Sequence, residues 1–201
     1  MTSTDQHPTS ARRVRLTTTD LALVAGFAAL VVVCAVLPAI NITVVPITLQ
    51  TFGVLLAGAV LGPLRGFLAV LLYLALGAAG LPVFSGGAAG LTVLTGPSVG
   101  YLVGFPLAAA LTGYLVTRLP RGAAARNVPL VFVCGLVGSA VFIHTFGMAG
   151  LVLRLDLTWA QAFDVDKVFW IGDLVKNVAM ALVATSVHRA FPDLLPRRRG
   201  A

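Results

Sequence analysis

Charged residues are scarce in this sequence, and glutamate is absent. Only 10% of the 201 residues are charged, against roughly 25% in a typical soluble domain. Hydrophobic residues make up 58% of the chain and the mean hydropathy is +0.98, which argues against a soluble fold. The strand alternation and aromatic girdles of a membrane barrel are missing as well. Apolar runs near the ~18 to 20 residues that a helix needs to cross a bilayer predict an all-α, polytopic membrane protein.

Residue types that carry catalysis, metal binding or nucleotide binding are also few. Lys167 and Lys176 are the only lysines, and neither follows the glycine spacing of a phosphate-binding loop. Any ATP-driven step must therefore come from another protein. Cys34 and Cys134 both lie in apolar runs, where a reduced, buried side chain is the expected state. The sequence predicts no catalytic residue, no cofactor and no metal site.

Six apolar spans account for the hydrophobic pattern. They cover residues 20–40, 48–62, 64–81, 99–117, 128–152 and 168–190. Residues 1–19 form a predicted disordered cytoplasmic tail, and residues 191–201 a basic cytoplasmic tail. The second span reaches only ~22 Å at 1.5 Å per residue. It must sit in a thin bilayer, be supported by neighbouring helices, or run partly extended.

Arginine placement predicts the orientation of these spans, because cytoplasmic loops are enriched in Lys and Arg. Six crossings put eleven arginines on the side of the N-terminus and only Arg154 and Lys167 on the other side. We therefore expect both termini in the cytoplasm. The net charge of +7 does not indicate nucleic-acid binding, since no soluble domain remains to carry a binding surface. The eleven are Arg12, Arg13, Arg15, Arg65, Arg118, Arg121, Arg126, Arg189, Arg197, Arg198 and Arg199.

The stretch LPVFSGGAAGLTVLTGPS, residues 81–98, is rich in glycine and lies on the predicted outer side. Non-helical backbone beside a bilayer is tolerated where protein covers it or where it lines a cavity. Gly86, Gly87 and Gly90 allow sharp turns and a close approach to a ligand. An ordinary flexible loop explains the stretch equally well.

The last span contains Asp173 and Lys176, three residues apart and hence on one helix face. Charges at membrane depth cost roughly 2.5 to 3.5 kcal/mol each, so such residues often mark a site. A structural ion pair is the alternative. His144 in the fifth span has no carboxylate partner in its own turn and is interpreted as a packing residue. An intramembrane enzyme using His144 and Asp173 is a remote second hypothesis.

The first span carries a stripe of small residues, Ala22, Ala25 and Ala29, that would let another helix approach closely. We expect that helix to belong to the same bundle, although a second protein remains an alternative. Asp20 follows three threonines and is predicted to be the N-cap of this helix.

Four motifs, taken in order, resemble the BioY family, the biotin-binding substrate component of energy-coupling factor (ECF) transporters. They are P-x-T-L-Q-T-F at 46–52, G-L-P-V-F at 80–84, G-P-x-x-G-Y at 96–101 and G-D-x-x-K at 172–176. The resemblance implies six helices with a biotin cavity near the outer face, covered by the loops after the first and third helices. The Ala-rich SGGAAG segment departs from the more glycine-rich or polar lid of many relatives.

The resemblance also implies residues and partners. A coupling membrane protein and ATPase subunits would dock from the cytoplasm and against the alanine stripe, in the plasma membrane of a bacterium. A different vitamin, or a carrier working alone, are the alternatives for function. The implied biotin-binding residues are Gln50, Tyr73, Phe84, Gly86, Gly87, Tyr101, Asp173 and Lys176.

Overall fold

The computed structural model describes residues 16–41, 43–120 and 122–195, and within them the chain is helical with no strand. A single antiparallel bridge joins Ile40 and Ile47. Residues 1–15 and 196–201, the larger part of both predicted tails, lie outside the described residues, as does Arg121. The helices are α1 (Thr18–Val36), α2 (Gln50–Leu61), α3 (Pro63–Ala78), η1 (Ser85–Gly87), η2 (Leu91–Thr95), α4 (Val99–Arg118), α5 (Val128–Gly138), η3 (Ser139–His144), α6 (Thr145–Leu155) and α7 (Trp159–Ala190).

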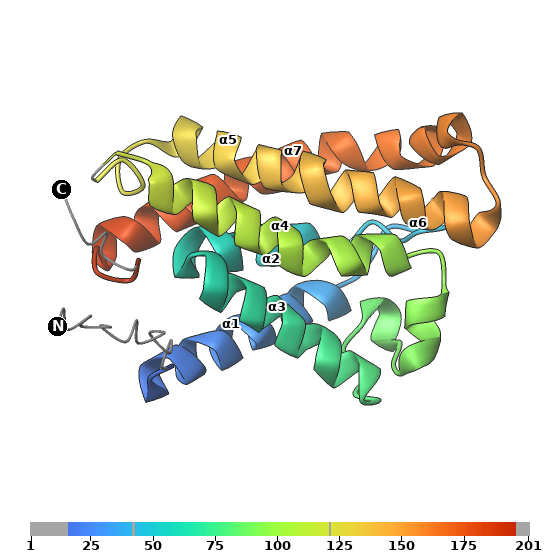
Figure 1. The fold of residues 1–201 in the computed structure, drawn as a ribbon, viewed down its shortest axis with the longest axis horizontal. Coiled ribbons are helices and arrows are strands. Elements are labelled where there is room, and N and C mark those ends of the chain that lie inside the picture. The colour runs from blue at the N-terminus through green and yellow to red at the C-terminus, as the bar shows by residue number, and fades with distance from the viewer. Residues whose placement is uncertain (1–15, 42, 121, 196–201) are drawn as a thin grey trace, which may run out of the picture.

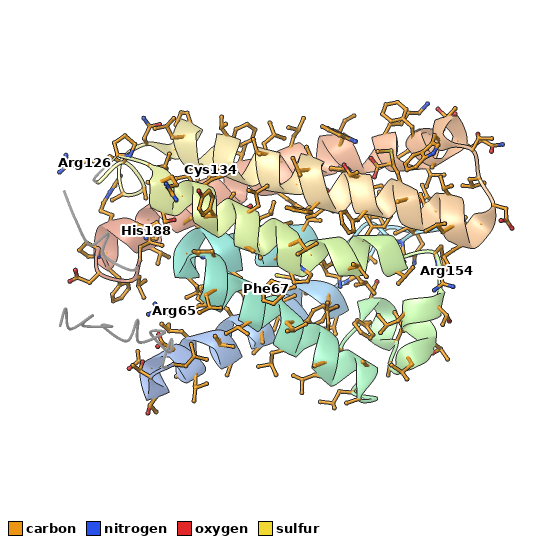
Figure 2. All side chains as sticks on the ribbon, in the orientation of Figure 1. Arg65, Phe67, Arg126, Cys134, Arg154 and His188 are labelled. Carbon is orange, nitrogen blue, oxygen red and sulfur yellow. The ribbon has the colours of Figure 1, made fainter. Side chains whose placement is uncertain are left out.

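The helices run along one long axis, so their connections gather at two ends (Figure 1). The start of α1, the α2–α3 turn, the α4–α5 connection and the end of α7 lie at one end, called the base end. Residues 37–41 and 43–49, η1, η2 and the α6–α7 connection lie at the opposite end, called the lid end. Arg65 and Arg126 lie at the base end, whereas Arg154 lies at the lid end (Figure 2).

Four helical segments in the described part of the chain are long and apolar enough to cross a membrane: α1, α4, the continuous run Val128–Leu155, and α7. The shorter α2 and α3 are apolar but have only 12 and 16 residues. In α2 every residue except Phe52 is buried, because α1, α3, α4 and α7 pack around it. Neighbouring helices therefore support the short second span, which is one of the three explanations left open by its length.

Glycine permits this close packing of α2. A side chain at Gly58 would overlap the backbone of Ala109 in α4, and one at Gly66 in α3 would overlap Gly58 itself. The three helix backbones thus approach more closely than any larger residue allows. A short helix enclosed in this way is shielded from lipid along its whole length.

The last helix begins nine residues before the predicted start of span 168–190. Thr158 caps it in a reciprocal capping box with Gln161, so helix formation is favoured well before the apolar run. Asp164 and Lys167, whose charges delayed the predicted start, form an exposed ion pair of 2.6 Å on the outside of the helix. Asp166 between them is fully buried, which places an unexpected carboxylate inside the bundle.

Two expectations for the first helix are wrong. Thr17, not Asp20, is the N-cap, and Asp20 is the third helical residue of a capping box. The stripe of Ala22, Ala25 and Ala29 does not pack inside the bundle but is exposed. A different face, which carries Val24, Ala28, Val31 and Ala35, packs against α2 and α3. Both cysteines are free and buried, as expected.

Candidate ligand-binding site

A cavity of about 180 Å³ lies toward the lid end, between α2, α4 and α7. One water needs only ~10 to 15 Å³ on a comparable measure, so the space suits a small organic molecule. Most of its wall is apolar, with polar groups concentrated at the start of α2 and on α7. The polar side chains that line it belong to Thr48, Gln50, Thr51, Ser85, Ser98, Tyr101, Asp173 and Lys176.

Asp173 and Lys176 form a close ion pair on the cavity side of α7. The side chains are only 9% and 12% exposed, respectively. The Lys176 ammonium also donates to the Thr48 carbonyl at 2.8 Å, and the Thr51 hydroxyl donates to Asp173 Oδ1 at 3.0 Å. The segment that opens α2 therefore holds both charges in place. An ammonium and a carboxylate at one wall can recognise an anion and N–H donors on the same ligand.

Gln50 and Phe84 line the cavity, and Tyr73 lies behind them. The Gln50 amide nitrogen donates to the Tyr73 hydroxyl, while the Gln50 carbonyl oxygen accepts from the Thr48 hydroxyl at 2.8 Å. The ring of Phe84 meets that of Tyr73 edge-on with 5.6 Å between centroids. Tyr73 is fully buried and does not line the cavity. It instead holds Gln50 and Phe84, which do line it.

The glycine-rich stretch is anchored to α3 at two points. Phe84 packs so closely on Gly77 that a side chain at Gly77 would overlap its ring. The Gly90 amide donates to the Gly77 carbonyl at 2.8 Å. Gly86 and Gly87 adopt positive φ of 67° and 77°, a backbone conformation that favours glycine. They do not line the cavity, which is lined here by Ser85 and Ala88.

A hydrogen-bonded cluster around Asp166 lies behind the cavity. Its carboxylate accepts from the Tyr101 hydroxyl and the Trp170 indole, both at 2.9 Å. His144 Nδ1 lies 3.0 and 2.9 Å from the two Asp166 oxygens, and the His144 ring stacks on Trp170. His144 therefore has a carboxylate partner, but that partner comes from α7 and not from its own turn.

The π-helical segment η3 joins α5 to α6 in one continuous helical run, and His144 is its last residue. Such segments insert a residue into the α-helical repeat and often occur at functional sites. Sequence reasoning missed Asp166, although one signal was present. Asp166 lies seven residues before Asp173, close to two helical turns, so the two carboxylates share a face of α7.

The predicted ligand-binding residues thus gather in one region of the bundle, in two groups. Gln50, Phe84, Tyr101, Asp173 and Lys176 line the cavity. Tyr73, Gly86 and Gly87 lie close to lining residues without being part of the lining.

Comparison with known proteins yields a consistent result. The model of the BioY family matches residues 6–193. A protein of Rhizobium etli named biotin transporter BioY is 41% identical over 187 residues, covering 91% of this chain and 100% of that protein. Another protein of that name, from Rhodobacter capsulatus, is 42% identical over 193 residues, covering 89% and 98%.

A solved structure agrees with these relatives. The crystal structure of the S-component for biotin from an ECF-type ABC transporter superposes with a TM-score of 0.80 at 27% identity, covering 87% of this chain and 95% of that one. The family match spans nearly all of the described residues, and two relatives exceed 40% identity over nearly their whole length. The chain belongs to the BioY family.

Proposed function

We propose that this protein is the biotin-capturing substrate component of an ATP-driven ECF-type vitamin transporter. The observation that carries the proposal is the cavity toward the lid end, which is lined by apolar side chains on most sides and by Asp173 and Lys176 at one wall. Biotin has a matching chemistry, with an apolar ring and chain, a carboxylate for an ammonium, and ureido N–H groups for a carboxylate. The named function of the relatives and of the superposed structure supports the same ligand.

The proposal includes six membrane crossings with the base end in the cytoplasm of a bacterium. Arginines of the described residues support this orientation, because Arg65, Arg118, Arg126 and Arg189 lie at or beside connections of the base end. Two of the crossings would then be α2, which neighbouring helices shield from lipid, and α3, which buries one face against those helices. The cavity would open toward the outer face, where a nutrient arrives.

A transporter of this kind needs partners to hydrolyse ATP. We propose a membrane coupling protein and a pair of ATPase subunits that dock from the base end. The stripe of Ala22, Ala25 and Ala29 is exposed on α1, so its small side chains leave room for a close approach by a helix of the coupling protein. The two relatives described above are named as transporters and not as enzymes, which disfavours catalysis by His144 and Asp173.

Calorimetric titration of the detergent-solubilised protein with biotin tests the proposal. We expect tight binding to wild type, and a loss of at least ~1.5 kcal/mol in Lys176→Ala and in Asp173→Ala, the low end for hydrogen bonds to charged groups. Lys167→Ala, which removes an exposed lysine of the same helix, is the matched control and should bind normally. Unchanged biotin affinity in both Lys176→Ala and Asp173→Ala would contradict the proposed site.

Competition with riboflavin and thiamine tests the alternative that the ligand is another vitamin. We expect neither compound to displace biotin. If riboflavin or thiamine displaces labelled biotin at a lower concentration than unlabelled biotin does, that vitamin is the ligand. The assignment to the transporter class would then still stand.

A further inference from the structure

Four ionisable side chains form a chain of contacts from the interior of the bundle to the cavity. Asp166 is fully buried and meets His144 at Nδ1. The other ring nitrogen of His144, Nε2, lies 3.6 Å from Asp173 Oδ2. Asp173 in turn pairs with Lys176 at the cavity wall. His144 and Asp166 do not line the cavity, but each contacts a residue that does, His144 through Asp173 and Asp166 through Tyr101.

The partners of Asp166 decide which ring nitrogen of His144 carries a hydrogen. The Tyr101 hydroxyl and the Trp170 indole both donate to this carboxylate, so Asp166 acts as an acceptor. His144 Nδ1 faces both of its oxygens and must therefore be N–H. In a neutral imidazole, Nε2 would then present a lone pair to the Asp173 carboxylate. A second proton on the ring converts this contact into a favourable one.

A second proton on the ring would change the net charge of this cluster. With a neutral imidazole, two carboxylates face one ammonium, and the cluster has a net charge of −1. With an imidazolium the charges of Asp166, Asp173, Lys176 and His144 sum to zero. The other elements packed here contribute uncharged groups, Tyr101 from α4 and Thr51 from α2. Trp170 stacks on the imidazole with 4.4 Å between ring centroids, and an aromatic face attracts a cation.

We propose that His144, oriented by Asp166, is a positioning residue that holds a proton needed for ligand binding. The imidazolium fixes Asp173 as a carboxylate at the cavity wall and cancels the extra negative charge. Loss of the proton leaves a buried site of charge −1, which repels an anionic ligand wherever its carboxylate lies in the cavity. The inference rests on the proposed function, because it takes biotin, a carboxylate, as the ligand.

The test is the pH dependence of biotin affinity in the full-length, detergent-solubilised protein between pH 6 and pH 8.5. A carboxylic acid is ionised throughout this range, so the ligand itself does not titrate. We expect the biotin dissociation constant of wild type to rise with pH and to approach about tenfold per pH unit, the limit for one required proton. In His144→Gln, which keeps an N–H donor but cannot titrate, this slope should disappear.

His188→Gln is the matched control. His188 is buried like His144, but it lies on α7 near the base end and contacts the Ala59 carbonyl at 2.9 Å. This variant should keep the wild-type slope. Titration of wild type at pH 8 in two buffers of different ionisation enthalpy adds a measurement that needs no variant. We expect an apparent binding enthalpy that depends on the buffer, because a proton is taken up with biotin.

Three results would overturn the inference while the proposed function stands. They are tight biotin binding with the same affinity across the pH range, a wild-type slope in His144→Gln, and no proton uptake at pH 8. If His144→Gln is not recovered folded, His144→Asn replaces it with the same expectations. Absence of biotin binding at every pH would overturn the proposed function itself, so the two failures are distinguishable.

Discussion

Buried or partly buried ion pairs occur at both ends of this bundle, but their surroundings and contacts differ. Near the lid end, Asp173 and Lys176 pair beside an apolar cavity. At the base end, Arg65 pairs with Asp20 at 2.6 Å and also donates to the Leu194 carbonyl at 3.0 Å. The base-end pair thus ties together the starts of α1 and α3 and the segment after α7. An ion pair in a membrane protein does not mark a ligand site by itself.

The space beside each pair makes the difference. A larger groove of about 510 Å³ runs past Asp20 and Arg65, but it is more open to the surface than the lid-end cavity. Asp20 is further engaged by the Thr17 amide and hydroxyl at 2.8 and 2.9 Å. The lid-end cavity is smaller, more enclosed and mostly apolar, so a ligand bound there exchanges water for protein contacts. Its enclosure, and not its volume, makes the lid-end cavity the better candidate for a ligand site.

The largest effect should come from the carboxylate that supports the lid-end site. Asp166→Ala leaves the Tyr101, His144 and Trp170 donors without their acceptor, and we expect a loss of about 3 to 5 kcal/mol in the free energy of unfolding, as for a broken buried ion pair. Chemical denaturation in detergent measures it. Asp164→Ala, which removes an exposed partner of Lys167 on the same helix, should change stability by less than ~0.5 kcal/mol. Equal losses of stability in Asp166→Ala and Asp164→Ala would show that the buried contacts of Asp166 do not stabilise the fold.

A smaller effect, on stability alone, should follow from breaking the base-end pair. Arg65→Ala removes the ion pair with Asp20 and the hydrogen bond to Leu194, and we expect a loss of about 1 to 2 kcal/mol, reduced by the partial exposure of Arg65. Biotin affinity should stay at the wild-type value, because the pair is remote from the cavity. A loss of biotin affinity in Arg65→Ala would contradict the view that the base-end pair stabilises the fold without affecting the cavity.

The smallest effect should come from a single hydroxyl at the lid end. Thr51→Val keeps the shape of the side chain but removes the donor to Asp173, and we expect biotin affinity to fall by about 1 kcal/mol, a typical net value for one hydrogen bond. Thr185→Val is the control, since the buried Thr185 hydroxyl has no partner among the described residues. Titration calorimetry should show wild-type affinity for the control. Wild-type biotin affinity in Thr51→Val would mean that the hydrogen bond from α2 to Asp173 does not contribute to binding.

The all-helical class and several of the apolar helices could be predicted from hydropathy. The apolar spans at 64–81 and 99–117 correspond closely to α3 and α4. The start of α7 was missed because Asp164, Asp166 and Lys167 break the apolar run, although the capping box at Thr158 begins the helix regardless. The exposure of Ala22, Ala25 and Ala29 was also missed. Small residues permit close packing equally well on either side of a helix, so their presence does not select the inward face.

The candidate site was predictable only in part, for the same kind of reason. Asp173 and Lys176 could be paired because residues three apart share a helix face. Thr51 could not be assigned to Asp173, because 122 positions separate them and helix packing alone brings them together. His144 could not be paired with Asp166, since the expected partner was sought within one turn and the actual one comes from another helix.

The sequence by itself determined that the chain is a bundle of apolar helices and that one opposite charge pair lies on a single face of the last helix. Both follow from local rules, the hydrophobic length needed to cross a bilayer and the 3.6-residue repeat. Only the tertiary structure decided that this face borders an enclosed cavity, that α2 is sheltered by its neighbours, and that two buried carboxylates meet one imidazole from opposite sides. Such contacts depend on which helix faces pack together, and that choice is made by side-chain volumes and glycines far apart in the chain.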